Sequence, residues 1–201
     1  MAEEKKFILA SSSATRQELL TRAGLAFNVA APGIDEEEVK ASLRSRRATG
    51  GATAEALAEL KAKKISGSNP GVLVIGADQM LVCGTLWFSK PETVDQARDQ
   101  LLTLRGKTHE LFTCVCVARD GERLWHHTET ARLTMRSFSD SFLDDYLQQM
   151  GSRALDSVGA YQVEGIGIQL FSRILGDYFA IMGLPILPLL DFLRTHMVAA
   201  R

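Results

Sequence analysis

Residues 6–24 have the sequence KFILASSSATRQELLTRAG, in which a strand, a serine loop and a helix follow one another directly. The stretch Lys6–Ala10 predicts a short buried strand, because a brief apolar run bounded by polar residues is typical of a strand covered on both faces. Leu19 and Leu20 lie on the apolar face of the helix, and Gly24 ends it. The chain is therefore expected to begin with a strand whose carboxyl end leads into a helix N-terminus.

The serine loop between this strand and helix is a candidate anion site. A helix N-terminus presents unpaired N–H groups and the positive end of the helix dipole. Ser11 and Ser13 add hydroxyl donors, and Arg16 adds a fork-shaped positive charge. The alternative interpretation is a simple helix cap, either Ser13 or Thr15, with Arg16 in solvent.

The composition of the whole chain limits the possible classes of function. The 201 residues are 46% hydrophobic and 23% charged, with a net charge of -1, which suits a single globular domain spanning residues 1–201. Such a balance provides no overall field for nucleic acid or an anionic membrane. The apolar runs are shorter than a membrane span of roughly 20 residues, and the start of the chain lacks a signal-peptide pattern. We therefore expect a cytoplasmic protein that binds neither nucleic acid nor membrane.

Beyond the first helix, the pattern alternates helices with strands and later changes to hairpins. The expected strands are Phe27–Ala30, Val72–Ala77, Met80–Val82, Leu86–Phe88, Thr108–Ala118, Arg123–Arg136, Ile168–Leu175 and Phe179–Met182. The expected helices begin at the acidic run Asp35–Glu38, at caps Thr53 and Thr93, at Phe138 and at Pro185. This order predicts an α/β fold with a mixed, twisted sheet flanked by helices.

Carboxylates and lysines in this pattern are candidates for chemistry. Asp78 follows the most buried predicted strand and could bind Mg²⁺, act as a general base, or simply occupy a turn. The acidic run Asp35–Glu38 could supply a second metal ligand, although acidic residues also suit a helix N-terminus. Lys61 lies on a helix, where lysines are usually solvated, whereas Lys90 is confined between a hairpin and a helix by Ser89-Lys90-Pro91.

Several familiar phosphate-binding classes are excluded by missing motifs. The chain has no GxxxxGKS/T sequence and therefore is not a P-loop protein. The segment Gly165–Leu170 lacks the third glycine of the dinucleotide fingerprint, and Asp78-Gln79-Met80 lacks the second aspartate of aspartyl-phosphate phosphatases. There is also no GxSxG elbow.

The ordered segments resemble the Maf family of nucleoside triphosphate pyrophosphatases over nearly the whole chain. One departure is Ala14-Thr15, where family loops usually have proline followed by a basic or aromatic residue. The segments that carry the resemblance are Leu9–Leu20, Leu57–Ala62, Gly76–Asp78, Ser89–Pro91, Leu104–His109, Thr113, Ala160–Gly165 and Gly183–Pro185.

The resemblance implies a fold of two lobes with a central cleft, assembly as a homodimer, and a divalent metal cofactor, Mg²⁺ or Mn²⁺. It implies hydrolysis of a nucleoside triphosphate to the monophosphate and pyrophosphate, with Asp78 as proton acceptor and Glu36 and Asp78 near the metal. The implied catalytic residues are Asp78, Lys61 and Lys90, and the implied substrate-binding residues are Ser11, Ser13, Thr15, Arg16, Gln79 and Glu164.

Gln79 and Glu164 resemble the family branch that prefers 7-methyl-GTP, whereas the branch preferring dTTP and UTP typically has Thr and Gln there. A carboxylate can accept both the N1–H and the 2-amino group of guanine, but it repels the carbonyls of uracil. Glu164 or an aromatic side chain, Trp87, Phe88 or Tyr161, could favour the positive charge of an N7-methylated base. The alternatives are a dTTP/UTP pyrophosphatase and a non-catalytic nucleotide-binding regulator of septum formation.

Overall fold

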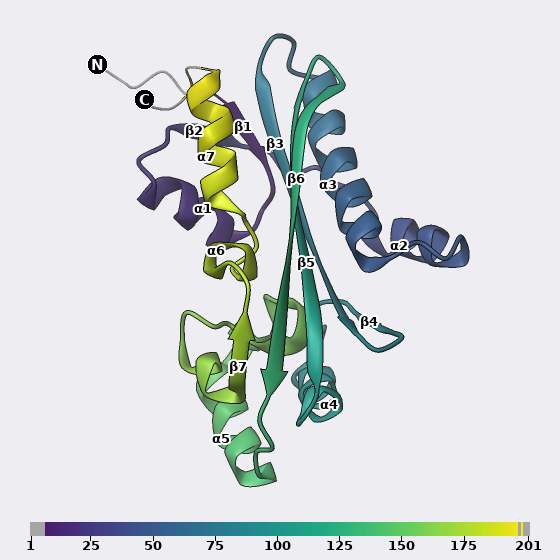
Figure 1. Ribbon diagram of the computed structural model, residues 1–201, viewed down its shortest axis with the longest axis vertical. Coiled ribbons are helices and arrows are strands. Elements are labelled where there is room, and N and C mark those ends of the chain that lie inside the picture. The colour runs from purple at the N-terminus through teal and green to yellow at the C-terminus, as the bar shows by residue number, and fades with distance from the viewer. Residues whose placement is uncertain (1–6, 197, 199–201) are drawn as a thin grey trace.

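One mixed sheet of seven strands runs through the computed structural model, which describes residues 7–196 and 198 (Figure 1). The strand order is β2-β1-β3-β5-β6-β7, with β4 paired to β3. β1 pairs in parallel with β2 and β3, and the other pairs are antiparallel. The predicted mixed α/β sheet is therefore confirmed. The strands are β1 (Phe7–Ala10), β2 (Phe27–Val29), β3 (Leu73–Cys83), β4 (Leu86–Phe88), β5 (Thr108–Arg119), β6 (Glu122–Met135) and β7 (Phe171–Leu175).

Helices cover both faces of this sheet, with α3 on one face and α1 and α7 on the other (Figure 1). The alternation of side chains along β3 explains this arrangement. Ile75 and Ala77 pack in the cluster formed with α1 and α7, whereas Met80 packs in the cluster formed with α3. The helices are α1 (Ala14–Arg22), α2 (Glu36–Ser45), α3 (Gly50–Gly67), α4 (Val94–Leu104), α5 (Asp140–Met150), α6 (Tyr178–Ile181) and α7 (Ile186–Thr195).

The strand, serine loop and helix at the start of the chain form as predicted, although Lys6 lies outside the described residues. β1 is buried throughout and α1 begins directly after the loop. Of the two possible caps, Ser13 is the one used, since its Oγ accepts a hydrogen bond from the backbone N–H of Arg16 at 3.4 Å. The N-terminus of α1 is thereby fixed at the carboxyl end of β1.

A gap between two partner strands lies along one edge of β3. β1 pairs with β3 only as far as Gly76, and β4 begins to pair with it at Leu81. Among the described residues, no strand covers residues 77–80 on that edge. The chain leaves β1 at Ser11 and leaves β4 just before Lys90, so the two predicted phosphate-binding loops flank the gap. This is the junction between the two predicted lobes.

The prediction that Asp78 ends its strand is wrong, because β3 continues as a single strand to Cys83. Its other edge stays paired with β5 from Val74 through Val82, so the strand has no reason to stop where β1 stops. The polar pair Asp78-Gln79 marks the gap in the sheet rather than the end of a strand.

Three further boundaries differ from the prediction. Thr49, not Thr53, caps α3, and the Thr53 hydroxyl instead donates to the Thr49 carbonyl within the helix. The predicted strand Phe179–Met182 is α6, because Asp177 caps it through the N–H of Ala180 at 2.7 Å. The first residues of the predicted strand Ile168–Leu175 form a short 3₁₀ helix. Short apolar runs do not distinguish helix from strand by periodicity.

Gly76 allows α3 to lie directly on β3. A Cβ added at Gly76 would lie 2.3 Å from the Ala58 carbonyl oxygen and 2.7 Å from the Ala62 nitrogen, both backbone atoms of α3. We expect Gly76→Ala to lower the free energy of unfolding by about 3 kcal/mol, because the helix must move. Urea unfolding measures this loss. Gly67→Ala is the control, since nothing lies within 4 Å of its added Cβ. A control loss as large as that of Gly76→Ala would contradict the packing argument.

Candidate functional site

A cleft of about 550 Å³ opens at the gap in the sheet. Its walls come from the β1–α1 loop, α2, α3, β3, the β4–α4 loop and the segments around Tyr161 and Gly183. Every site residue predicted from the sequence lines this cleft. These residues are Ser11, Ser13, Thr15, Arg16, Glu36, Lys61, Asp78, Gln79, Lys90 and Glu164.

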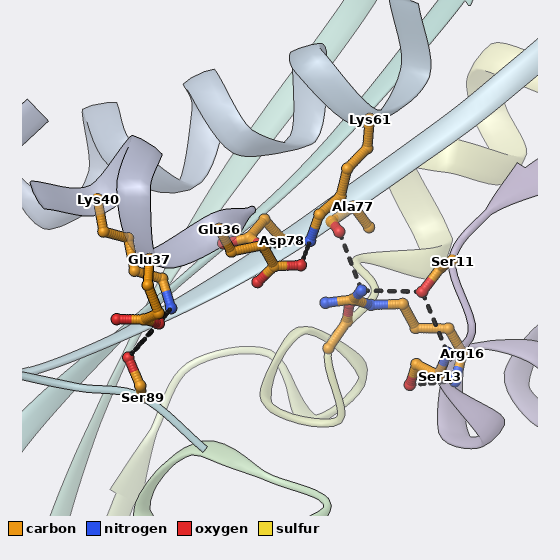
Figure 2. Close-up of polar contacts among 11 residues, drawn as sticks. Ser11, Ser13, Arg16, Glu36, Glu37, Lys40, Lys61, Ala77, Asp78 and Ser89 are labelled. Carbon is orange, nitrogen blue, oxygen red and sulfur yellow. Dashed lines mark hydrogen bonds and ion pairs between the residues drawn. The ribbon is translucent and has the colours of Figure 1, made fainter. Parts of the chain in front are cut away.

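Lys61 is shared by two carboxylates at the centre of the cleft (Figure 2). Its Nζ lies 2.6 Å from Asp78 Oδ1 and 2.6 Å from Glu36 Oε1. The side chains of Lys61 and Asp78 are only 6% and 5% exposed, whereas that of Glu36 is 41% exposed. Lys61 and Asp78 thus form a buried ion pair, and Glu36 adds a second, more exposed carboxylate to the same lysine.

The neighbouring lysines of α3 point to other partners. Lys63 pairs with Glu59 and Glu122 on the surface, and Lys64 donates to the Gly33 carbonyl. Of these three lysines, only Lys61 lines the cleft. It lies on the face of α3 that packs against β3, next to the strand residue two positions after Gly76. The interpretation of Lys61 as a solvated helix lysine is therefore wrong.

The surroundings shift the pKa values of the two carboxyl groups in opposite directions. Burial raises the pKa of Asp78 above its ordinary value, and nearby Glu36 adds to this effect, while Lys61 opposes it. Burial also acts to raise the pKa of Glu36, but Lys61, Lys40 and Arg16 together outweigh it, and the pKa of Glu36 falls below its ordinary value. When two neighbouring carboxyl groups have pKa values shifted in opposite directions, one often exchanges protons as an acid or base while the other stays ionised. Asp78 is the better candidate for a base.

Asp78 Oδ2 is buried and has no hydrogen-bond partner among the described residues. An unpaired buried acceptor of this kind costs on the order of 1–3 kcal/mol, so it needs an explanation. The oxygen fits a divalent cation, since Mg²⁺ typically binds one or two carboxylates and completes its shell with water and substrate phosphates. In the described part of the chain no cluster of three or more protein ligands could enclose a metal. The donor set of Asp78 and Glu36 is thus suited to a cation held jointly with a substrate.

Arg16 is held by three backbone or side-chain oxygens, and Figure 2 shows its contacts with Ala77 and Ser11. Its Nη1 donates to the Ala77 carbonyl at 2.9 Å and to Ser11 Oγ at 3.1 Å, and its Nε donates to the Gly183 carbonyl at 2.8 Å. Burial lowers the pKa of Arg16, and Asp78 and Glu36 oppose this change, so the guanidinium remains charged. The alternative of a solvated Arg16 is therefore wrong.

Lys90 approaches the cleft from the opposite side. Burial lowers its pKa, and the positive charge of Arg16 lowers it further. Lys90 makes no hydrogen bond or ion pair within residues 7–196 and 198, and it is exposed at the cleft. A nearby positive charge disfavours the charged form of a lysine, whereas a bound anion stabilises it. Lys90 is therefore available to bind an anionic ligand.

The sequence analysis missed Lys40, which also lines the cleft. Glu37 Oε1 accepts hydrogen bonds from Lys40 Nζ at 2.8 Å and from Ser89 Oγ at 2.7 Å (Figure 2). This network ties α2, which carries Glu36, to the loop that carries Lys90. The spacing of three residues between Glu37 and Lys40 on a helix is the signal that could have found the pair.

One further wall of the cleft is formed by the segment that contains Tyr161 and Glu164. Tyr161 is buried, and its hydroxyl lies 2.8 Å from Nε2 of the buried His109. Glu164 is exposed at the cleft. Of the three aromatic residues considered from the sequence, Tyr161 lines the cleft, whereas Trp87 and Phe88 do not.

Gln79 lines the cleft with its amide engaged by the protein. Nε2 donates toward Thr113 Oγ1 at 2.9 Å, the Ala180 carbonyl at 3.0 Å and the Ile181 carbonyl at 3.1 Å. The last two oxygens belong to α6. The amide nitrogen of Gln79 therefore holds α6.

Comparison with known proteins gives consistent matches over this chain. A family model described as Maf-like protein matches residues 6–196. A "nucleoside triphosphate pyrophosphatase" of Paramagnetospirillum magneticum is 54% identical over 94% of this chain and 97% of its own length. A "7-methyl-GTP pyrophosphatase" of Brucella abortus is 50% identical over 94% and 95%, and one of Rhizobium meliloti is 47% identical over 93% and 94%. Separately, no helix among the described residues is long and apolar enough to cross a membrane.

Proposed function

This chain belongs to the Maf-like protein family, and on that premise we propose that it hydrolyses nucleoside triphosphates to nucleoside monophosphate and pyrophosphate. We further propose that it uses a divalent cation, Mg²⁺ or Mn²⁺, and favours 7-methyl-GTP or a similar modified nucleotide. The observation that carries the proposal is the buried Asp78 carboxylate, which is held by Lys61 through Oδ1 and has an unpaired Oδ2.

The charged side chains that line the cleft support this proposal. Water attacks the α-phosphorus, its oxygen forms the new P–O bond, and the bond to the bridging oxygen breaks as pyrophosphate leaves with the electron pair. Asp78, with its raised pKa, accepts the proton of the attacking water. Arg16 and Lys90 line the cleft and neutralise charge on the phosphate oxygens. A divalent cation held by Asp78 and Glu36 would neutralise further charge and lower the pKa of a bound water.

The base preference rests on Glu164. Its carboxylate is exposed at the cleft, close in sequence to the buried Tyr161, whose contact with His109 holds this part of the segment in place. A carboxylate accepts two adjacent donors of guanine and favours the positive charge of the methylated ring. The names of the Brucella and Rhizobium relatives support this choice.

A nucleotide panel tests the base preference. With Mg²⁺ or Mn²⁺ present, we expect pyrophosphate release from 7-methyl-GTP with a kcat/KM at least about tenfold above that for dTTP or UTP. Glu164→Gln should reduce this ratio about tenfold, because the amide offers one acceptor where the carboxylate offers two. Glu92→Gln, an exposed cleft residue, is the matched control. A clear preference of the unaltered protein for dTTP or UTP would reject the substrate assignment.

The same experiment decides the competing class of function. Tight nucleotide binding without pyrophosphate release would indicate a regulator of septum formation rather than an enzyme. Removal of divalent cations by a chelator should abolish turnover, and added Mg²⁺ or Mn²⁺ should restore it.

The proposal also includes a cytoplasmic homodimer, which light scattering would detect as twice the 22.0 kDa chain mass.

A further inference from the structure

Gln79 and its neighbour Asp78 point to opposite faces of β3, as successive strand residues do. Asp78 meets Lys61 of α3, whereas the amide of Gln79 reaches the carbonyls of Ala180 and Ile181 in α6. Thr113 on β5, opposite Gln79 in the register, also donates to the Ala180 carbonyl at 2.9 Å. Two side chains from neighbouring strands therefore hold one end of α6.

α6 depends on these contacts for its position. It contains four residues, too few to form a stable helix without support from the rest of the protein. Asp177 caps its first turn, while Gln79 and Thr113 bind its carbonyl end. The loss of either contact at the carbonyl end would allow the following turn to shift.

The turn after α6 also holds Arg16. The N–H of Gly183 bonds to the Ala180 carbonyl at 2.9 Å, and the Gly183 carbonyl accepts from Arg16 Nε at 2.8 Å. Gly183 has a φ of +101°, a conformation that favours glycine. The turn thus links the carbonyls bound by Gln79 to the carbonyl that orients the guanidinium of Arg16.

We infer that Gln79 is a positioning residue for Arg16, acting through the turn of residues 180–183. Its amide fixes Ala180 and Ile181, and this places the Gly183 carbonyl that orients the guanidinium toward the substrate phosphates. The inference rests on the proposed function for its kinetic test. In this role Gln79 acts on Arg16, which binds the phosphates, instead of contacting the base.

Kinetics distinguish the two roles. We expect Gln79→Ala to lower kcat about tenfold, because a displaced guanidinium loses alignment with the reacting phosphate. The factor should be the same for 7-methyl-GTP, GTP, dTTP and UTP, and KM should change less than about twofold. In an Arg16→Lys background, which removes the Nε contact with Gly183, Gln79→Ala should have almost no further effect. Additive losses, or a change of more than about fivefold in the ratio between bases, would overturn the inference.

A matched control is Gln96→Ala, since Gln96 lines the same cleft but its side chain accepts from the Glu92 N–H. Its effect on kcat should stay within about twofold. Gln79→Glu is a second variant of the same size, in which a carboxylate repels the two carbonyls, and it should reproduce the base-independent loss. Urea unfolding of each variant identifies any that fails to fold.

A measurement that needs no turnover separates this inference from the proposed function. In the intact protein the Arg16 Nε–H should give an NMR signal protected from solvent exchange, because it donates to Gly183. Gln79→Ala should shift this signal and speed its exchange at least about tenfold, whereas Gln96→Ala should not. An unchanged Arg16 signal in Gln79→Ala would overturn the inference even if the protein releases pyrophosphate. A perturbed signal in a protein without turnover would reject the proposed function alone.

Discussion

Asp78→Asn is expected to lower kcat for pyrophosphate release by about a thousandfold while the protein still folds and binds nucleotide. The amide keeps the shape of the side chain but cannot accept a proton from water, and general base catalysis contributes roughly 10²- to 10⁴-fold. It also removes the unpaired carboxylate oxygen that suits a cation. Steady-state kinetics with Glu92→Gln as control measure the effect. Turnover that survives Asp78→Asn would show that another group is the base.

The pH dependence of turnover tests the same residue independently. Because burial raises the pKa of Asp78, the acidic limb of the kcat/KM profile, measured at a low concentration of divalent cation, should lie above the ordinary pKa of an aspartate. The free energy of unfolding should change in the opposite direction to turnover, falling as the pH rises. A carboxyl group whose pKa is higher in the folded than in the unfolded protein contributes stability that is complete below the unfolded pKa and is lost as the pH rises through the folded pKa. The stability of Asp78→Asn relative to the unaltered protein should therefore increase with pH across that window, as urea unfolding at several pH values would show. A constant difference would contradict the raised pKa.

Lys61→Met is expected to remove both activity and a large part of the stability. It leaves Asp78 and Glu36 close together without their shared cation, and breaking a buried ion pair in this way costs about 3–5 kcal/mol. Because Lys61 lowers the pKa of Asp78, any remaining activity should appear only at higher pH than in the unaltered protein. Urea unfolding and the pH profile of pyrophosphate release measure these effects.

Lys63→Met is the matched control on the same helix. Lys63 pairs with surface carboxylates and does not line the cleft. This variant should unfold at nearly the same urea concentration as the unaltered protein and keep its turnover, since exposed ion pairs contribute little. Equal losses in the two variants would mean that Lys61 matters only as part of α3.

Local signals predicted most of the elements correctly. The Thr93 cap, and the hairpin of β5 and β6 around Asp120-Gly121, depend on hydrogen bonds and backbone angles within a few residues. Such features are encoded where they occur. Two errors arose near helix caps. Thr49, not the predicted Thr53, caps α3, and Asp177 caps a short helix where the apolar run Phe179–Met182 predicted a strand.

By itself, the sequence determined the mixed α/β sheet and the candidate site residues that the cleft brings together, although not Lys40, because strand, loop and helix signals and ordered motifs are local. Only the tertiary structure decided which lysine of α3 meets Asp78, and that Arg16 and Gln79 converge on the turn of residues 180–183. These contacts join parts of the chain that lie far apart in sequence. They exist because Gly76 lets α3 approach β3, and because β3 extends past the end of β1 to leave an open edge.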